Sequence, residues 1–430
     1  MISSPSAGLK GTFRVPGDKS ISHRSIMLGS LANGITEVSG FLEADDALAT
    51  LSAFEQMGVK IDRIETGKLR IHGVGLHGLK APQNTLDVGN SGTSMRLLSG
   101  ILAGQQFDSV LAGDRSLTKR PMRRVLDPLS LMGANVESTA SGTSPLKIKG
   151  KTELSGIHYA MPMGSAQVKS CLMLAGLYAV GTTTIEEPAV TRDHTERMLR
   201  GFGYPVSTNK NVVSLEGGGA LTATSIDVPG DISSAAFFMV AASITPNSEI
   251  TLEHIGINPT RTGIIDILLK MGADIRLANE RLVGGEKVAD IHVKSSQLIG
   301  IQVPEDLVAL AIDEFPVIFI AAAYAKGTTV VTGAEELRVK ESDRIQAMVD
   351  GLQSLGVNIE GTSDGAVIKG GLVQPGSIES FDDHRIAMAF AVAGLNAEGT
   401  VTVNNCENVS TSFPGFVELA TDCGFKLKAQ

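Results

Sequence analysis

The stretch EQMGVKI at residues 55–61 recurs along the chain in five altered copies. Each copy ends a helix-like segment with an apolar residue, a glycine and a further apolar residue. The other copies are SLMGANV (130–136), RGFGYPV (200–206), LKMGADI (269–275), QSLGVNI (353–359) and TDCGFKL (421–427). Glycine directly after a helix suits a C-terminal cap, because the backbone there takes a positive φ at which a side chain is penalised. The regular spacing predicts six copies of one structural unit.

A second repeated pattern lies between these glycines: a helix of small residues, followed by a strand that opens with Gly and Thr. It is found in ANGITEVSG (32–40), AVGTTTIEE (179–187), AKGTTVVTG (325–333) and AEGTVTVNN (397–405), and in degenerate form in LAGQQFDSVLAG (102–113) and TPNSEITLEHI (245–255). Each copy reads strand, helix, strand, polar loop, helix, glycine and a strand pair. Six such units predict an α/β protein of two domains with three units each.

The phrase VPGD occurs twice, in VPGDKSISHR (15–24) and in VPGDISSAAF (228–237). The two copies mark corresponding starts, of the first and of the fourth unit. If the N-terminal strand belongs to the far domain, the chain crosses between domains twice. We therefore expect one domain at 17–228 with units one to three, a second at 1–16 plus 229–430 with units four to six, and hinges near 15–18 and 228–231.

The composition indicates a soluble, cytoplasmic protein. Its 430 residues include no tryptophan and carry a net charge of −9, which disfavours nucleic-acid binding because that needs a basic face. Only three cysteines occur, without a CxxC pair, so we expect neither disulfides nor structural zinc. The start MISSPSAGLKGTF lacks a signal-peptide pattern, and apolar runs such as 316–325 are too short to span a bilayer. We expect no metal, no cofactor, no membrane or nucleic-acid partner, and a monomer.

In so acidic a chain, clustered basic residues point to a local anion site. Lys19, Ser20 and Arg24 follow the first VPGD at a helix start, where backbone N–H groups also attract anions. Gly92 lies in a Gly-rich turn into a helix, and Arg120 lies in the basic stretch 113–125. Each feature also has a simpler interpretation. The first VPGD stretch could open a capped surface helix, Gly92 could lie in a tight turn, and the 113–125 stretch could be a solvated basic face.

Later units place further polar groups just before their helices. Ser165 and Gln167 are neutral hydrogen-bonding groups, and Arg192 precedes a helix. Charged groups follow in the fifth and sixth units: Asp313, Lys340, Glu341, Arg344, Asp383, His384 and Arg385. A carboxylate between two cations is usually a structural ion pair, but the same arrangement can tune a proton donor. Helix starts gathered in one cleft would suit a very anionic ligand.

These motifs together resemble the 5-enolpyruvylshikimate-3-phosphate (EPSP) synthase family. The resemblance runs from about residue 5 to 425 and rests on VPGDKSISHR, GNSGTSMR, KRPM, SAQVKS, TRDHTE, KESDRI, DDHRIAMAFAVAGL and SFPGF. It implies a two-domain inside-out α/β barrel of six βαβαββ repeats, three per domain, that closes over shikimate 3-phosphate and phosphoenolpyruvate. The implied reaction of the shikimate pathway moves the enolpyruvyl group to the 5-hydroxyl and releases phosphate.

The resemblance also implies roles for individual residues. Shikimate 3-phosphate would be bound by Lys19, Ser20, Arg24, Ser165, Ala166, Gln167, Arg192, Asp313 and Lys340. Phosphoenolpyruvate would be bound by Lys19, Gly92, Arg120, Gln167, Arg344 and Arg385. Glu341 would exchange a proton with the methylene carbon of phosphoenolpyruvate, and Asp313, assisted by Lys19, would accept the proton of the 5-hydroxyl.

Several positions depart from one branch of the family and resemble its second class. Leu97 stands where that branch has proline, Ala166 replaces the second of its paired serines, and Thr411 replaces a phosphate-facing lysine, so that role is not transferred. Gly92, rather than alanine, leaves room for glyphosate, which we expect to inhibit.

Two rival interpretations remain at this point. A UDP-N-acetylglucosamine enolpyruvyl transferase would normally carry a cysteine in the loop matching 113–120, where this chain has none. A non-enzymatic anion-binding or RNA-end-modifying relative would explain the repeats, but not the set of Lys19, Asp313 and Glu341.

Overall fold

Contacts between residues divide the chain into two units, each with its own core. The computed structural model describes residues 1–429. One unit, here the 17–228 unit, comprises Gly17–Val228 and Val283–Gly285. The other, here the 229–429 unit, comprises Met1–Pro16, Pro229–Leu282 and the described chain from Glu286.

The 17–228 unit contains six helices and three sheets. The helices are α1 (Lys19–Leu31), α2 (Asp45–Gln56), α3 (Gly92–Ala103), α4 (Arg123–Leu131), α5 (Ala166–Gly176) and α6 (His194–Gly201). One sheet has the order β14 (Leu221–Thr222), β3 (Ala32–Ser39), β5 (Lys68–Val74), β4 (Lys60–Glu65), with β15 (Ser225–Asp227) also paired to β3. The second has the order β6 (Leu86–Asp87), β7 (Ser109–Ala112), β9 (Leu146–Lys149), β8 (Asn135–Glu137). The third has the order β10 (His158–Ala160), β11 (Thr182–Glu186), β13 (Val212–Glu216), β12 (Ser207–Asn209).

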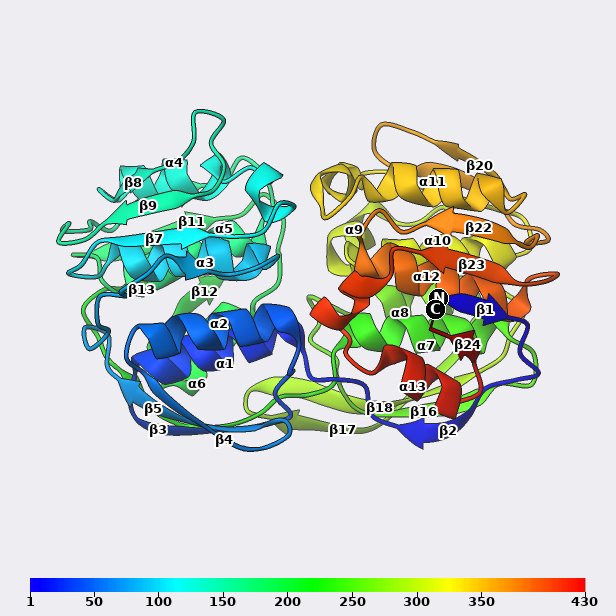
Figure 1. The fold of residues 1–430 in the computed structure, drawn as a ribbon, viewed down its shortest axis with the longest axis horizontal. Coiled ribbons are helices and arrows are strands. Elements are labelled where there is room, and N and C mark those ends of the chain that lie inside the picture. The colour runs from blue at the N-terminus through cyan, green and yellow to red at the C-terminus, as the bar shows by residue number, and fades with distance from the viewer. Residues whose placement is uncertain (430) are drawn as a thin grey trace. The chain divides into compact units, whose positions relative to one another are not determined.

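The 229–429 unit also contains three sheets. Its helices are α7 (Ile232–Ile244), α8 (Gly263–Lys270), α9 (Glu305–Val308), α10 (Phe315–Tyr324), α11 (Arg344–Ser354), α12 (His384–Ala393) and α13 (Phe416–Asp422). One sheet has the order β17 (Asp274–Val283), β18 (Glu286–Lys294), β16 (Glu249–Gly256), β2 (Lys10–Phe13), and another β19 (Thr328–Val331), β21 (Ala366–Lys369), β20 (Asn358–Gly361). In the third, β1 (Ile2–Ser4) lies between β23 (Val401–Asn404) and β24 (Lys426–Lys428), and β22 (Gly376–Glu379) pairs β23 (Figure 1).

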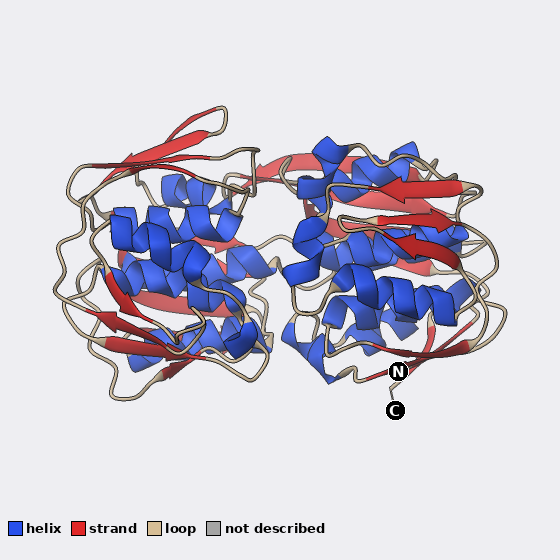
Figure 2. Cartoon of the chain, turned by 90° about the horizontal axis from the view of Figure 1, so that it is seen from above, coloured by secondary structure: helices blue, strands red, loops and turns tan. Residues whose placement is uncertain are grey.

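The most apolar helices form the interior of each unit. Every residue of α7 is buried, and α10 and α12 are buried almost throughout and contact each other and α7. In the 17–228 unit, the buried helices α1, α3 and α5 form the interior in the same way. A helix that is apolar on all sides must be enclosed, and Figure 2 shows the helices inside each unit with the strands toward its outside.

The predicted glycine caps are confirmed at all six positions. The residues Gly58, Gly133, Gly203, Gly272, Gly356 and Gly424 have φ values from 77° to 111°. They follow α2, α4, α6, α8, α11 and α13. At Gly58, for example, the N–H donates to the Glu55 carbonyl at 2.9 Å, which closes the last turn of α2. The mixed α/β class is thus as expected, whereas the inside-out barrel of six βαβαββ repeats stays a prediction.

Within residues 1–429, no helix is long and apolar enough to cross a membrane. The same residues contain no group of three or more His, Cys, Asp or Glu side chains that could hold a metal ion.

Candidate active site

Three helices of the 17–228 unit begin at candidate residues, each with a capping side chain. Asp18 accepts a hydrogen bond from the Ile21 N–H at 2.8 Å, Ser91 from Ser94 at 3.1 Å and Ser165 from Val168 at 3.4 Å. Lys19, Gly92 and Ala166 are therefore the first residues of α1, α3 and α5. Their remaining N–H groups and the helix dipoles favour an anion at these ends.

Lys19 is held at the start of α1 by an ion pair with Asp46, near the start of α2. The lysine side chain keeps 20% of its surface exposed, whereas the Asp46 side chain keeps 9%. The ammonium is thus both anchored and accessible, as a group that meets an anionic ligand must be.

Arg24 is buried one turn further along α1. Its Nε donates to Thr195 Oγ1 at 2.7 Å, and its Nη2 donates to Ser170 Oγ at 2.8 Å. Its Nη1 donates to the Ser20 carbonyl at 2.9 Å. Arg24 therefore ties α1 to α5 and α6, a structural role that the sequence did not suggest.

Two guanidinium groups lie over the Gly92 turn. Arg96 Nη1 donates to Gln167 Oε1 at 2.7 Å, and Arg120 Nη2 donates to Asn90 Oδ1 at 2.6 Å. A Cβ added to Gly92 would lie 2.7 Å from Arg96 Nη1 and 3.1 Å from Arg120 Nη1. An alanine here would therefore displace the ends of both guanidinium groups, whereas glycine leaves them over the turn. Arg96 was missed as a candidate, although its place four residues into the helix after the Gly-rich turn was a usable signal.

Arg344 is the centre of the candidate residues in the 229–429 unit. Only 1% of its side chain is exposed. Its Nε donates to Asp383 Oδ2 at 2.8 Å, its Nη2 to Glu341 Oε2 at 2.6 Å and its Nη1 to Asp313 Oδ1 at 3.3 Å. Lys340 Nζ lies 3.5 Å from the same Asp313 oxygen. The two predicted proton-transfer carboxylates therefore share one guanidinium.

The charges in this cluster shift its pKa values in opposite directions. Burial opposes the charge of Arg344, but the neighbouring carboxylates Asp383, Glu341 and Asp313 raise its pKa above the usual value. Burial alone would raise the pKa of Asp383, but the charge of Arg344 lowers it below the usual range. Arg344 and Asp383 thus remain charged at neutral pH.

Arg385 occupies the first turn of α12. The Asp383 side chain caps this helix by accepting from the Arg385 N–H at 2.9 Å. The Arg385 Nη1 donates to the Asp313 carbonyl at 3.1 Å and lies 4.0 Å from Glu314 Oε1. The guanidinium thus lies beside the backbone of the predicted base.

His23, in the first VPGD stretch, has a structural role. His23 is fully buried on α1, and its Nδ1 lies 2.7 Å from Thr50 Oγ1. Burial and the charges of Lys19 and Arg24 hold its pKa well below the usual value, so it is neutral at pH 7.

Comparisons with known proteins cover nearly the whole chain. A protein-family model described as EPSP synthase (3-phosphoshikimate 1-carboxyvinyltransferase) matches residues 4–419. The chain belongs to the EPSP synthase family. A relative from Methylococcus capsulatus, named 3-phosphoshikimate 1-carboxyvinyltransferase, is 62% identical over 99% of this chain and 97% of its own length. One of the same name from Hydrogenovibrio crunogenus is 60% identical, again over 99% and 97%.

Solved structures agree with this family membership. The EPSP synthase of Acinetobacter baumannii superimposes with a TM-score of 0.90 at 57% identity, covering 100% of this chain and 99% of the other. The predicted enzyme class, a 3-phosphoshikimate 1-carboxyvinyltransferase (EC 2.5.1.19), is thereby confirmed. The family model, both relatives and the solved structure carry the EPSP synthase or 3-phosphoshikimate 1-carboxyvinyltransferase name, not that of the rival enolpyruvyl transferase.

The EPSP synthase candidates divide between the two units. The 17–228 unit holds Lys19, Ser20, Arg24, Gly92, Arg120, Ser165, Ala166, Gln167 and Arg192. The 229–429 unit holds Asp313, Lys340, Glu341, Arg344 and Arg385. Their individual roles stay predictions.

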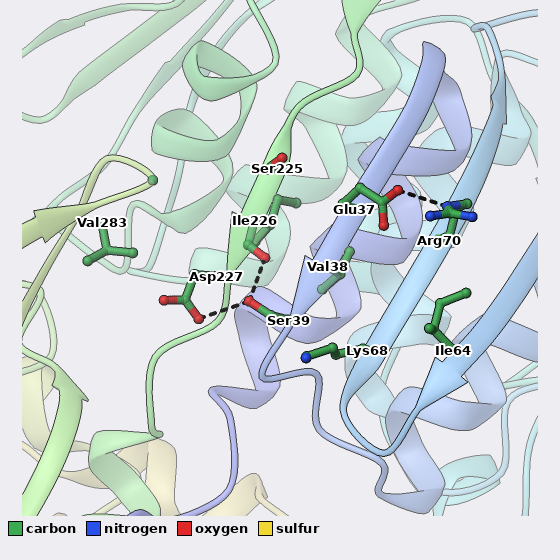
Figure 3. A pocket seen from close by; sticks show the side chains of 11 residues that line it. Glu37, Val38, Ser39, Ile64, Lys68, Arg70, Ser225, Ile226, Asp227 and Val283 are labelled. Carbon is green, nitrogen blue, oxygen red and sulfur yellow. Dashed lines mark hydrogen bonds and ion pairs between the residues drawn. The ribbon is translucent and has the colours of Figure 1, made fainter.

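Two cavities lie apart from these candidates. One cavity of about 350 Å³ is lined by residues of β3, β4, β5 and β15 and by Val283 and Gly284 (Figure 3). Within it, Arg70 donates a hydrogen bond to Glu37, and Ser39 donates one to Asp227. Another of about 650 Å³ is lined by 403–407, 413–418 and neighbouring residues of the 229–429 unit. The described residues that line these two cavities include none of the candidates.

Proposed function

We propose that this chain transfers the enolpyruvyl group of phosphoenolpyruvate to the 5-hydroxyl of shikimate 3-phosphate by addition and elimination. The observation that carries the residue assignment is the Arg344 cluster, in which Asp313 and Glu341 both bind one buried guanidinium. Two carboxylates near a fixed positive charge can take opposite parts in proton transfer, one as donor and one as acceptor.

Electrostatics explains why so many cations are needed. Both substrates are multiply charged anions, and their mutual repulsion must be offset by fixed positive groups before they can meet. In the proposal, the shikimate 3-phosphate side is bound by Lys19, Ser20, Arg24, Ser165, Ala166, Gln167, Arg192, Asp313 and Lys340. The phosphoenolpyruvate side is bound by Lys19, Gly92, Arg120, Gln167, Arg344 and Arg385. Arg96 orients Gln167 through the 2.7 Å bond to its amide oxygen.

The proposed reaction has two balanced stages. Glu341 gives a proton to the methylene carbon of phosphoenolpyruvate, and the 5-hydroxyl oxygen bonds to the adjacent carbon while Asp313, assisted by Lys19, takes the hydroxyl proton. This gives a tetrahedral ketal. In the second stage the carbon–oxygen bond to phosphate breaks, the new methyl group returns a proton to Glu341, and the departing phosphate takes the proton from Asp313.

The domain predictions belong to the same proposal. We propose domains 17–228 and 1–16 plus 229–430, hinges near 15–18 and 228–231, and three βαβαββ repeats per domain in an inside-out α/β barrel. Closure of the domains on the substrates would exclude water and align the reacting atoms.

The proposal is tested by phosphate release. The protein mixed with shikimate 3-phosphate and phosphoenolpyruvate is expected to release phosphate, and omission of either substrate removes the signal. The same assay with UDP-N-acetylglucosamine is expected to give none. Release with the UDP-sugar, and none with shikimate 3-phosphate, reverses the assignment.

Glyphosate is expected to inhibit in competition with phosphoenolpyruvate, and Gly92→Ala is expected to weaken that inhibition. The added Cβ would push on the Arg96 and Arg120 guanidiniums. Displaced guanidinium groups hold an anion less well, and the inhibition constant should rise about tenfold, which corresponds to about 1.4 kcal/mol. The KM for phosphoenolpyruvate should rise as well.

Steady-state inhibition at several phosphoenolpyruvate concentrations measures both effects. Gly371→Ala is the matched control, since its added Cβ would meet nothing within 4 Å. Inhibition that is not competitive with phosphoenolpyruvate contradicts the expectation.

A further inference from the structure

A buried lysine on α5 has no part in the chemistry proposed above. Lys169 has 1% of its side chain exposed, and its Nζ lies 2.7 Å from Glu187 Oε1 and 2.7 Å from Glu196 Oε1. Both glutamates are buried as well. Such a cluster is costly to bury, and apolar side chains of the same volume often stabilise a fold as well or better. Stability alone therefore does not explain why this charged cluster is buried here.

The lysine holds the loop that carries Arg192. Glu187 follows β11, and its Oε2 accepts a hydrogen bond from the Thr191 N–H at 3.2 Å and another from the Thr191 hydroxyl. Lys169 Nζ also donates to the Thr191 carbonyl at 3.5 Å. Arg192 is the next residue, so the loop is fixed directly before it.

The same helix carries three of the proposed shikimate 3-phosphate ligands. Ser165 caps α5, and Ala166 and Gln167 form its first turn, directly before the turn of Lys169. Lys169 thus links the start of α5 to the 187–192 loop across one buried contact. A ligand bound both by the α5 start and by Arg192 is sensitive to this spacing, because hydrogen bonds weaken steeply when donor and acceptor move away from their preferred distance and angle.

We propose that Lys169 and Glu187 are positioning residues that set the place of Arg192 relative to Ser165, Ala166 and Gln167, and so set the affinity for the phosphorylated shikimate. This inference rests on the proposed function of those four residues.

Glu196 provides a matched comparison within the same cluster. It binds the same ammonium at the same distance, but it lies on α6, after the loop. The start of α6 is also held by Thr195, which accepts from Arg24 Nε at 2.7 Å and donates to Ser170 Oγ at 2.7 Å. Loss of the Glu196 charge should therefore leave the loop in place.

The test compares Glu187→Gln with Glu196→Gln in steady-state kinetics and in direct binding of shikimate 3-phosphate by calorimetry. We expect Glu187→Gln to raise the KM and Kd for shikimate 3-phosphate about tenfold, the loss that follows when one charge-assisted hydrogen bond is weakened. The kcat, and the KM for phosphoenolpyruvate, should stay within about twofold, because only ground-state binding is changed, and Glu196→Gln should leave all values within about twofold. Thr191→Val, a change at a partly exposed position, removes only the hydroxyl bond to Glu187 and should give a smaller rise of the same kind.

A double-mutant cycle separates positioning from general stability. In an Arg192→Ala background, Glu187→Gln should change the KM for shikimate 3-phosphate by less than about twofold, because the group that it positions is gone. An equal effect with and without Arg192, or equal effects of the two glutamine variants, overturns the inference. If the wild-type protein releases no phosphate from the two substrates, the proposed function fails instead. If Glu187→Gln does not fold, the Thr191→Val cycle decides.

Discussion

Glu341→Gln is expected to abolish turnover while the Kd for shikimate 3-phosphate stays within about twofold. General acid catalysis contributes about 10²- to 10⁴-fold, and this residue would act in both stages, so a loss near the upper end is expected. Glutamine has the same size and still offers an oxygen to Arg344 Nη2, which Glu341 now binds at 2.6 Å. It has no proton to give to the methylene carbon. The change should therefore affect chemistry and not the fold.

Phosphate release measures turnover, and calorimetry measures binding. Asp350→Asn is the control, because it makes a carboxylate-to-amide change on α11 at an exposed position, where Asp350 accepts a hydrogen bond from Gln346 at 2.6 Å. It is expected to turn over normally. A Glu341→Gln variant with near-normal turnover would remove Glu341 from the proposed proton transfer.

The features that could be predicted from the sequence are those set by nearby residues. Glycine directly after a helix indicates a positive φ at that residue, and this depends only on its neighbours in the sequence. The six glycine caps could therefore be predicted from a pattern of a few residues. The same holds for Asp18, Ser91 and Ser165, whose side chains cap the helices that they precede. The groups of charged residues at helix starts could also be predicted, because clustered basic residues stand out in an acidic chain.

Contacts between distant segments were not predictable in this way. Lys169 forms ion pairs with Glu187 and Glu196 because folding brings the end of β11 and the start of α6 next to α5. The second VPGD motif is another case, because VPGDISSAAF lacks the lysine and arginine of the first copy. In the structure Ser233 donates to Glu314 and accepts from Arg261 Nη2 at 2.7 Å. Both residues are charged and buried, and they lie in the turns before α10 and α8. Nothing within VPGDISSAAF indicates either partner.

Ser233→Ala tests whether this network contributes to stability and not to turnover. Turnover of the folded protein should stay near normal, because Ser233 is not among the proposed ligands. The melting temperature should fall, since removal of the hydroxyl leaves the buried Glu314 oxygen without this donor at a cost of about 1–3 kcal/mol. Ser233→Ala therefore has to be assayed well below its melting temperature.

Lys19→Ala, directly after the first VPGD where the second copy has Ile232, is expected to lower kcat/KM about 10²- to 10³-fold, the loss seen when one fixed group that stabilises developing charge is removed. Lys19 is proposed to contact both substrates, so both KM values should rise together with the fall in kcat. Asp46→Asn separates this from the loss of the ion pair, because it breaks the contact with Asp46 but keeps the ammonium. We expect Asp46→Asn to lose less than about tenfold, since the ammonium can still reach an anion in the same place. If Asp46→Asn is as damaging as Lys19→Ala, then the lysine acts by joining α1 to α2, and the charge of the first VPGD copy is structural.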